Sequence, residues 1–362
     1  MTKVLFILDD LSGGGAERVF VNIANGFTAN TIVVEFLVGE KKGIYLDILN
    51  PSIPINEVGG TSLLKYLITF PDIFRKNNYT HIFTASHYTS SAAIISKKIT
   101  GSSAKIYLTH HYSLPRSRPF RYFKGDLVLK LIHFFITPHA DKIIAVSNGS
   151  LEWLRKYSHH SLKQGIFIYN PVYDDGIYSL AKEPIEFPID IKDKIVLLAV
   201  GRLVEQKDHI TLIKSFVVFK QTHANAVLFI LGTGPLQSIL KNYIQKNNLS
   251  SCIFLMGFES NPYKWIAKAD VFILSSIYEG FGNVIVEAMA FGKTVVSTNC
   301  PSGPAEILED GKLGYLCAVE NPIELSNSIE KALQVPIDGN TLIKATLQYT
   351  IKETVKKYIE IL

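Results

Sequence analysis

The segment VFILSSIYEGFGNVIVEAMAFGKTVVST, residues 271–298, contains two continuous apolar runs, at 271–276 and 294–298. A glycine-containing loop and a helical pattern separate the two runs. Strands that are apolar throughout, with helices between them, are typical of a parallel sheet covered on both faces. Three further runs of this kind precede the segment, at 195–200, 226–231 and 252–256. The second half of the chain is therefore predicted to form a doubly wound α/β sheet.

The first half follows the same pattern less regularly. A chain of 362 residues with 47% hydrophobic composition is too long for one ordinary core, so two domains are expected. Two Rossmann-like domains are the simplest account of the alternation. The apolar runs of the first half lie at 3–8, 31–38, 81–85, 104–109 and 141–146.

We expect an N-terminal domain over residues 1–170 and a C-terminal domain over residues 191–340. Residues 171–190 are predicted to be a linker, because this stretch contains three prolines and no helical period. The last stretch, 341–362, carries an apolar stripe at helical spacing that must pack on one of the domains. This C-terminal helix can pack back on the N-terminal domain.

Cysteine usage and hydropathy indicate a cytoplasmic protein that does not cross a membrane. The three cysteines are widely spaced and form no C-x-x-C pair, which argues against a disulfide framework or a zinc site. The apolar run at the amino terminus stops at Asp9, too early for a signal peptide. The most apolar later segment, 127–136, is interrupted by Lys130 and His133 and is too short to span a bilayer.

Positive charge is concentrated in the first half of the chain. Residues 1–180 carry 19 basic and 13 acidic residues, whereas residues 181–362 carry 18 and 19. Within the first half, residues 97–163 hold 12 basic groups against three acidic ones, a local charge of +9. Aromatic residues interleave this charge at 113–135. The pattern suits an anionic membrane surface, a nucleic acid, or simply a solvated basic face.

Glycine-bearing loops follow all five predicted strands of the second half. The carboxyl ends of parallel strands lie at one edge of a sheet, so these loops should converge on one binding crevice. Arg202 and Lys207 follow the first strand, where a guanidinium and an ammonium group suit a diphosphate. The loops read GRLVEQKD, GTGP, GFES, IYEGFGN and NCPSGP.

The loop EGFGN leads into a helix that begins near Asn283. Gly280 and Gly282 let the backbone approach a ligand, and the free amides of the helix start face the same crevice. Glu287 lies in the first turns of this apolar helix, where a carboxylate is costly to bury without partners. It can accept hydrogen bonds from ribose hydroxyls or pair with a structural Arg or Lys, and the residues alone leave both readings open.

The stretch LDDLSGGGAERV, residues 8–19, runs from a strand through three glycines into a helix. Gly13 and Gly15 fit the first two positions of G-x-G-x-x-G, but Arg18 occupies the third, and no Walker lysine follows. The absence of a complete fingerprint argues against a nicotinamide-dependent dehydrogenase, which would share the doubly wound sheet. The residues alone leave this loop unassigned.

These motifs together resemble the retaining glycosyltransferases of family 4, which have the GT-B fold of two Rossmann-like domains facing a central cleft. The resemblance rests on Glu279 and Glu287 in EGFGNVIVE, on GRLVEQKD and on GTGP. It extends to GGGAERVFVNIANGF near the amino terminus, to IYNPV between the domains and to EAMAFGKTVVSTNCPSGPAEIL. The most similar pattern is that of bacterial members that use UDP-sugars to extend lipid-linked or lipopolysaccharide glycans.

The resemblance implies a role for each matching position. Arg202 and Lys207 would grip the donor diphosphate without a metal ion, Glu287 would hold the ribose, and Glu279 would contact the transferred sugar. The strand AKIYLT would deliver an active-site histidine, for which we choose His111, with His110 as the alternative. The other positions implied in donor binding are Phe258 near the base, the backbone amides of Phe281, Gly282 and Asn283, and the loop glycines Gly14 and Gly15 from the opposite domain.

The expected function is transfer of a hexose or N-acetylhexosamine from a UDP-sugar to a hydroxyl of a lipid-linked saccharide, with retention of configuration. No cofactor, metal ion or nucleic acid is expected. The basic region would dock on the inner face of the cytoplasmic membrane, so that the protein is peripheral. Two alternatives stay open: a non-catalytic subunit that binds sugar nucleotides, and a UDP-sugar epimerase on the same fold.

Overall fold

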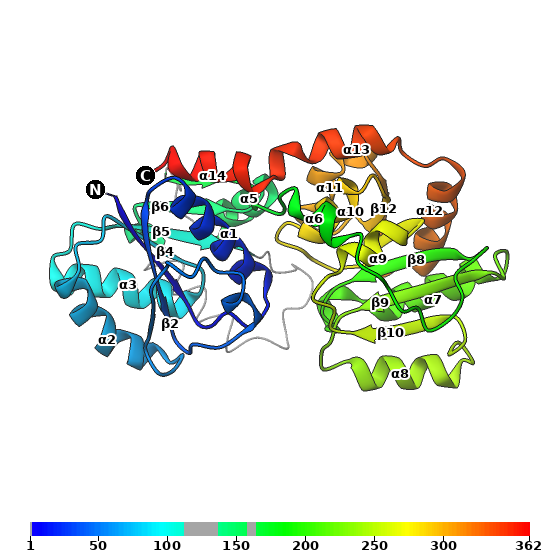
Figure 1. Cartoon of the computed structure of the whole chain (residues 1–362), viewed down its shortest axis with the longest axis horizontal. Coiled ribbons are helices and arrows are strands. Elements are labelled where there is room, and N and C mark those ends of the chain that lie inside the picture. The colour runs from blue at the N-terminus through cyan, green and yellow to red at the C-terminus, as the bar shows by residue number, and fades with distance from the viewer. Residues whose placement is uncertain (1, 112–136, 158–163) are drawn as a thin grey trace. The chain divides into compact units, whose positions relative to one another are not determined.

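The computed structural model describes residues 2–111, 137–157 and 164–362 (Figure 1). Within them the chain forms two compact units, each with its own sheet. The first unit comprises the described residues up to Val172 together with Thr350–Leu362, and the second comprises Tyr173–Tyr349. None of the helices in the described part of the chain has the length and apolar character that a membrane span requires.

The first unit is built on a seven-stranded parallel sheet with strand order β3-β2-β1-β4-β5-β6-β7. This order reverses direction between β1 and β4, as in dinucleotide-binding folds. Its strands are β1 (Lys3–Leu8), β2 (Val33–Val38), β3 (Ile55–Glu57), β4 (His81–Thr84), β5 (Lys105–His110), β6 (Lys142–Ala145) and β7 (Gly165–Phe167). Its helices are α1 (Gly15–Ala29), α2 (Leu63–Lys76), α3 (His87–Thr100), α5 (Asn148–Tyr157) and α14 (Ile351–Ile359).

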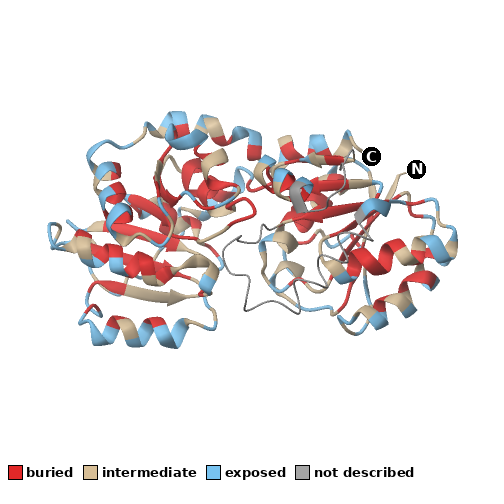
Figure 2. Cartoon of the chain, turned by 180° about the vertical axis from the view of Figure 1, so that it is seen from behind, coloured by how far each residue is buried: buried red, intermediate tan, exposed pale blue. Residues whose placement is uncertain are grey.

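Alternating strand residues of this sheet point to two separate apolar cores. Phe6 and Phe36 face the core that α1 and α14 cover, whereas Leu5 and Leu37 face the core under α2, α3 and α5. Because both faces are buried, the strands read as continuous apolar runs rather than as alternating ones. Figure 2 shows the buried strands enclosed by helices that expose their outer sides.

The second unit repeats this architecture with a six-stranded parallel sheet of order β10-β9-β8-β11-β12-β13. The order reverses between β8 and β11. Its strands are β8 (Ile195–Val200), β9 (Ala226–Leu231), β10 (Ile253–Gly257), β11 (Val271–Leu274), β12 (Thr294–Thr298) and β13 (Tyr315–Cys317). Its helices are α6 (Gly176–Leu180), α7 (His209–Lys220), α8 (Gln237–Lys246), α9 (Tyr263–Lys268), α10 (Asn283–Ala290), α11 (Pro304–Ile307), α12 (Pro322–Gln334) and α13 (Gly339–Thr346).

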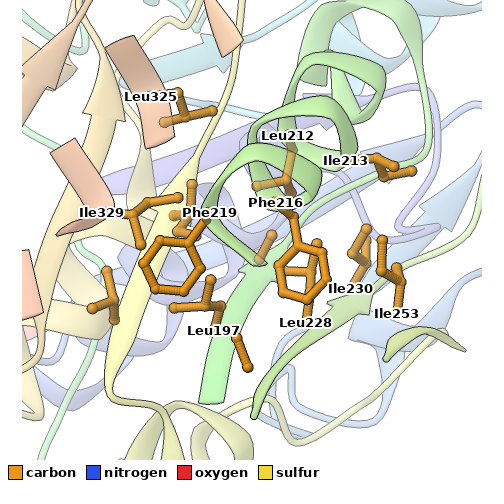
Figure 3. Packing of buried hydrophobic residues seen from close by; sticks show 14 of the residues in the cluster. Leu197, Leu212, Ile213, Phe216, Phe219, Leu228, Ile230, Ile253, Leu325 and Ile329 are labelled. Atoms are coloured by element: carbon orange, nitrogen blue, oxygen red, sulfur yellow. The ribbon is translucent and has the colours of Figure 1, made fainter. Parts of the chain in front are cut away.

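Helices α7, α8 and α12 close the main core of the second unit. Phe216 and Phe219 of α7 pack on every second residue of the central strands, among them Leu197 and Leu228 (Figure 3). Leu325 and Ile329 of α12 complete the layer. The core therefore fixes α7 on the sheet, and with it the loop that joins β8 to α7.

The predicted α/β fold class, with two parallel-sheet units, is confirmed. The runs at 3–8, 195–200, 226–231 and 294–298 coincide with β1, β8, β9 and β12. The sequence analysis missed β3, β7 and β13, which have three residues each and lie at sheet edges. Strands this short contain too few apolar residues to produce a recognisable run.

The segments expected to be a linker and a C-terminal helix divide between the units. Within 171–190, helix α6 belongs to the second unit. Helix α13 also belongs to the second unit, whereas α14 lies beside α1 in the first (Figure 1). Val355 and Tyr358 of α14 are buried in the core that contains Phe6 and Phe36. The chain thus returns to its first unit at Thr350.

Replacing Phe216 by alanine should destabilise the second unit by about 3–5 kcal/mol, because the ring is fully buried between α7 and the sheet. The neighbouring Val217 is 36% exposed, so Val217→Ala should cost less than about 1 kcal/mol. Chemical denaturation followed by circular dichroism measures both. Equal losses for the two variants would contradict the packing described for α7.

Candidate functional site

The two loops at the reversal of strand order in the second unit carry the candidate site. Strands β8 and β11 pair directly, with Val271 opposite Leu197. The loop after β8 leads through the 3-10 helix η3 (Glu205–Lys207) into α7, and the loop after β11 leads into α10. Because both strands end at the same sheet edge, the two loops meet there, which is where open α/β sheets bind ligands.

Lys207 and Glu279 form an ion pair across these loops. Lys207 Nζ lies 2.5 Å from Glu279 Oε1, and the two side chains are only 15% and 8% exposed. A pair this far from water is screened little, and removing one partner leaves a poorly solvated charge behind. The structure therefore brings together two residues that the sequence analysis assigned to different parts of the donor.

Hydroxyl groups directly after β11 and at the end of β12 hold this pair in place. Ser276 Oγ donates to Glu279 Oε1 at 2.6 Å, and Ser275 Oγ donates to the main-chain oxygen of Lys207 at 2.7 Å. Thr298 Oγ1, at the end of β12, donates to the main-chain oxygen of Ser276 at 2.5 Å. All three hydroxyl residues are buried. The sequence analysis missed them, although they are the polar residues that end the runs at 271–276 and 294–298.

Arg202 lies in the same loop as Lys207 but differs from it in its surroundings. Its side chain is exposed and makes no ion pair with the described part of the chain. The loop backbone is held by hydrogen bonds from Leu203 N–H to Thr233 O and from Ile277 N–H to Gln206 O. A guanidinium group on a fixed loop can bind an anion that enters from solvent.

Helix α10 begins at Asn283, as predicted, directly after Gly282. Gly282 has φ of +105°, a conformation that favours glycine, and it is the N-cap of the helix. The carboxylate of Glu287 is carried by the buried side of α10, and Glu287 is 2% exposed. Phe281 is also buried and packs edge-on against Tyr349. The first turn of α10 therefore directly follows the loop that holds Glu279.

The loop after β12 packs against the loop that carries Glu279. The N–H group of Glu279 donates to the main-chain oxygen of Pro301 at 3.4 Å. Gly303 has φ of +88°, and a Cβ atom there would lie 1.9 Å from the carbonyl oxygen of Phe281. Only glycine fits so close to this carbonyl group. The loop after β12 therefore fixes the backbone that carries Glu279 and Phe281.

Phe258 lies at another loop of the same sheet edge. It follows β10, the edge strand beyond β9, and its side chain is 56% exposed. An exposed aromatic ring at the carboxyl end of a strand can stack on a planar ligand group. The structure shows no contact between Phe258 and the Lys207–Glu279 pair.

The remaining predicted residues lie in the first unit. Gly14 is the N-cap of α1 and Gly15 is its first residue. His111 directly follows β5, and its ring lies 5.9 Å from that of Phe20 of α1. His111 is half-buried, its Nε2 lies 3.0 Å from Thr109 Oγ1, and burial lowers the pKa of its imidazole to about 4.

His110, the alternative to His111, is the last residue of β5 and has different neighbours. Its ring stacks on Trp153 of α5 at a centroid distance of 5.6 Å. The two histidines thus contact helices from opposite faces of the sheet, α5 for His110 and α1 for His111. Of the two, His111 is the one beside the helix that starts at Gly14 and Gly15.

Two expectations from the sequence concern charge and metals. The basic and aromatic stretch 113–135, on which the anionic-membrane prediction mainly rests, lies outside the described residues. Over the described ranges, no group of three or more His, Cys, Asp and Glu side chains is arranged to hold a metal ion.

Solved structures with the same architecture identify the class of fold. The Anabaena protein HepE, solved in complex with UDP-glucose, superposes with a TM-score of 0.81 at 20% identity, and the match covers 100% of both chains. The apo form of the lipopolysaccharide outer core galactosyltransferase WaaB matches with a TM-score of 0.76 at 20% identity, over 99% of this chain and 98% of its own. The predicted GT-B fold is confirmed.

Family models match both units of the chain. The model described as Glycosyltransferase Family 4 matches residues 13–175, and the model described as Glycosyl transferases group 1 matches residues 181–348. The chain therefore belongs to the glycosyltransferases with the GT-B fold, and it combines a domain of each of these two kinds.

The chain is also similar to a named glycosyltransferase. A 4-alpha-N-acetylgalactosaminyltransferase from Campylobacter jejuni, named for its N-acetylgalactosamine-N,N'-diacetylbacillosaminyl-diphospho-undecaprenol substrate, is 35% identical over 221 residues. That match covers 61% of this chain and 57% of the relative, so the chain spans little more than half the length of this relative.

Acid should destabilise the first unit through His111. Because burial lowers the folded-state pKa to about 4, against about 6.5 in the unfolded chain, the unfolded state takes up a proton first as the pH falls. The stability contributed by the neutral ring is thus fully present above pH ~6.5 and is lost as the pH falls towards ~4. Urea denaturation of the wild type and His111→Asn measures this, and the variant should lose less stability over that interval. An NMR titration midpoint of His111 near 6.5 would contradict the prediction.

Proposed function

We propose that the protein transfers a hexose or N-acetylhexosamine from a UDP-sugar to a hydroxyl group of a lipid-linked saccharide, with retention of the anomeric configuration. The observation that carries this proposal is the buried Lys207–Glu279 pair at the strand reversal of the second unit. The pair places a cation that suits a diphosphate next to a carboxylate that suits sugar hydroxyls. The donor class is supported by the UDP and UDP-glucose complexes of structures with the same fold.

Lys207 and Arg202 are the groups we assign to the donor diphosphate. As the sugar departs, negative charge grows on the diphosphate and positive charge on the sugar ring. These two cations, together with the amides at the start of α10, stabilise the growing negative charge. We assign Glu287 to the ribose hydroxyls, and Phe258 to the neighbourhood of the base.

The assigned route is a front-face substitution. The bond between the anomeric carbon and the diphosphate oxygen breaks, the acceptor oxygen bonds to that carbon on the same face, and the diphosphate takes the acceptor proton. Glu279 then orients the sugar instead of attacking it. The surroundings of Glu279 favour this role, because both Lys207 and Ser276 already engage its Oε1 atom and reduce its nucleophilicity.

The acceptor side is assigned to the first unit. We propose that His111 and the backbone of Gly14 and Gly15 meet the reacting groups, and that the acceptor is a saccharide carried on a lipid. Relatives named for a diphospho-undecaprenol substrate and for lipopolysaccharide core biosynthesis support this acceptor class. Such an acceptor is embedded in a membrane, so we propose that the protein works at the inner face of the cytoplasmic membrane.

The decisive assay incubates the protein with a panel of UDP-sugars, with and without a membrane lipid extract, and measures UDP release. Release only with lipid is the expected result. Glu279→Gln should lower kcat roughly 10–100-fold, because a charge-assisted hydrogen bond to the sugar is weakened. Glu330→Gln, the same substitution on α12, should retain the wild-type rate.

The other outcomes of this assay separate the alternatives. Tight binding of a UDP-sugar without any release would indicate a non-catalytic subunit, and an isomerised donor would indicate an epimerase. A wild-type rate for Glu279→Gln would overturn the role assigned to that residue while leaving the transferase itself intact.

Membrane association is tested by sedimentation with vesicles. More protein should sediment with vesicles containing anionic lipid than with neutral ones, and the difference should shrink in high salt, because screening weakens the attraction. Equal sedimentation with both kinds of vesicle would remove the electrostatic basis of the proposal.

A further inference from the structure

The two carboxylate oxygens of Glu279 have different surroundings. Oε1 accepts from both Lys207 Nζ, at 2.5 Å, and Ser276 Oγ, at 2.6 Å. No hydrogen bond from the described residues reaches Oε2. One oxygen therefore holds the side chain in place, and the other is available to a ligand.

The two donors to Oε1 differ in how firmly they are placed. Lys207 has a long, flexible side chain, and its ammonium group is the cation that we assign to the donor diphosphate. Ser276 is fully buried two residues after β11, and its main-chain oxygen accepts a hydrogen bond from Thr298. A short side chain on a fixed backbone cannot leave Glu279, whereas a lysine can turn towards a second anion.

Binding of a diphosphate changes the balance between these two donors. As Lys207 shares its charge with the diphosphate, its attraction for Glu279 weakens. A buried carboxylate that loses a partner either moves or destabilises the complex. Only a second, fixed donor keeps Glu279 in its orientation during this change.

We propose that Ser276 is a positioning residue, which holds Glu279 Oε1 so that Oε2 stays directed at a hydroxyl of the transferred sugar while Lys207 engages the diphosphate. This inference rests on the proposed function and deepens it. It assigns the adjacent serines different tasks, since Ser275 holds the main chain of Lys207 and Ser276 holds the carboxylate.

The test compares Ser276→Ala with Ser215→Ala. Ser215 is an equally buried serine of α7 whose hydroxyl donates to the main-chain oxygen of Leu212, away from the site. Calorimetry gives the Kd of UDP and of the UDP-sugar, and steady-state assays give kcat and KM. Ser276→Ala should change the Kd of UDP by less than about threefold from the wild-type value. It should lower kcat by about tenfold, and it should also lower by about tenfold the factor by which the UDP-sugar binds more tightly than UDP. Ser215→Ala should leave all of these values unchanged.

A double-mutant cycle shows whether Ser276 acts through Glu279. In a Glu279→Gln background, Ser276→Ala should lower kcat no further, because the carboxylate that it positions is already gone. Ser276→Cys, whose thiol is slightly larger and donates weakly, should lower kcat by less than Ser276→Ala does. Equal weakening of UDP and UDP-sugar binding, or a full additional loss of kcat in the double variant, would overturn the proposal.

Thermal unfolding of the donor-free protein separates this proposal from the proposed function. The changes in Tm caused by Ser276→Ala and Glu279→Gln should be non-additive, because the two side chains share a hydrogen bond. If the wild type binds no UDP-sugar, the proposed function fails whatever the Tm values are. If it transfers sugar and the Tm changes add, the role of Ser276 alone fails.

Discussion

The ion pair between Lys207 and Glu279 depends on a topological constraint that governs both units. Parallel strands end at one sheet edge, and where the strand order reverses, two neighbouring strands send their helices to opposite faces. The loops after β8 and β11 therefore meet without a helix between them, and their two charges come within 2.5 Å. Burial keeps the pair from being screened, and the hydroxyl groups of Ser276 and Ser275 fix both sides of it.

The apolar cores of the two units hold the loops and helices that carry these polar side chains. Phe216 and Phe219 hold α7 on the sheet, and α7 in turn fixes the loop that carries Lys207. Gly303 plays the corresponding part for Glu279, because its close approach to Phe281 locks the loop between β11 and α10. In the first unit, α1 lies over one face of its sheet, and its Phe20 contacts His111. Apolar packing thus determines where the side chains of Lys207, Glu279 and His111 lie. Their own polar interactions would not define a single position.

Much of the fold could be predicted because both faces of each sheet are buried. Continuous apolar runs revealed ten of the strands, several with their observed bounds, such as β8 and β12. The edge strands β3, β7 and β13 escaped detection, since three residues carry no clear pattern. The C-terminal stripe was recognised, but its division into α13 and α14, which belong to different units, depends on tertiary contacts.

By itself, the sequence determined which chemical groups follow which strands. It placed Arg202, Lys207, Glu279 and Glu287 at the carboxyl edge of one sheet, since that edge follows from strand order and glycine-bearing loops. Tertiary structure alone decided that Lys207 pairs with Glu279, and that Ser276 shares the same carboxylate oxygen. The reason is physical: a motif fixes spacing along the chain, whereas a hydrogen bond between loops depends on how two strands and their helices pack.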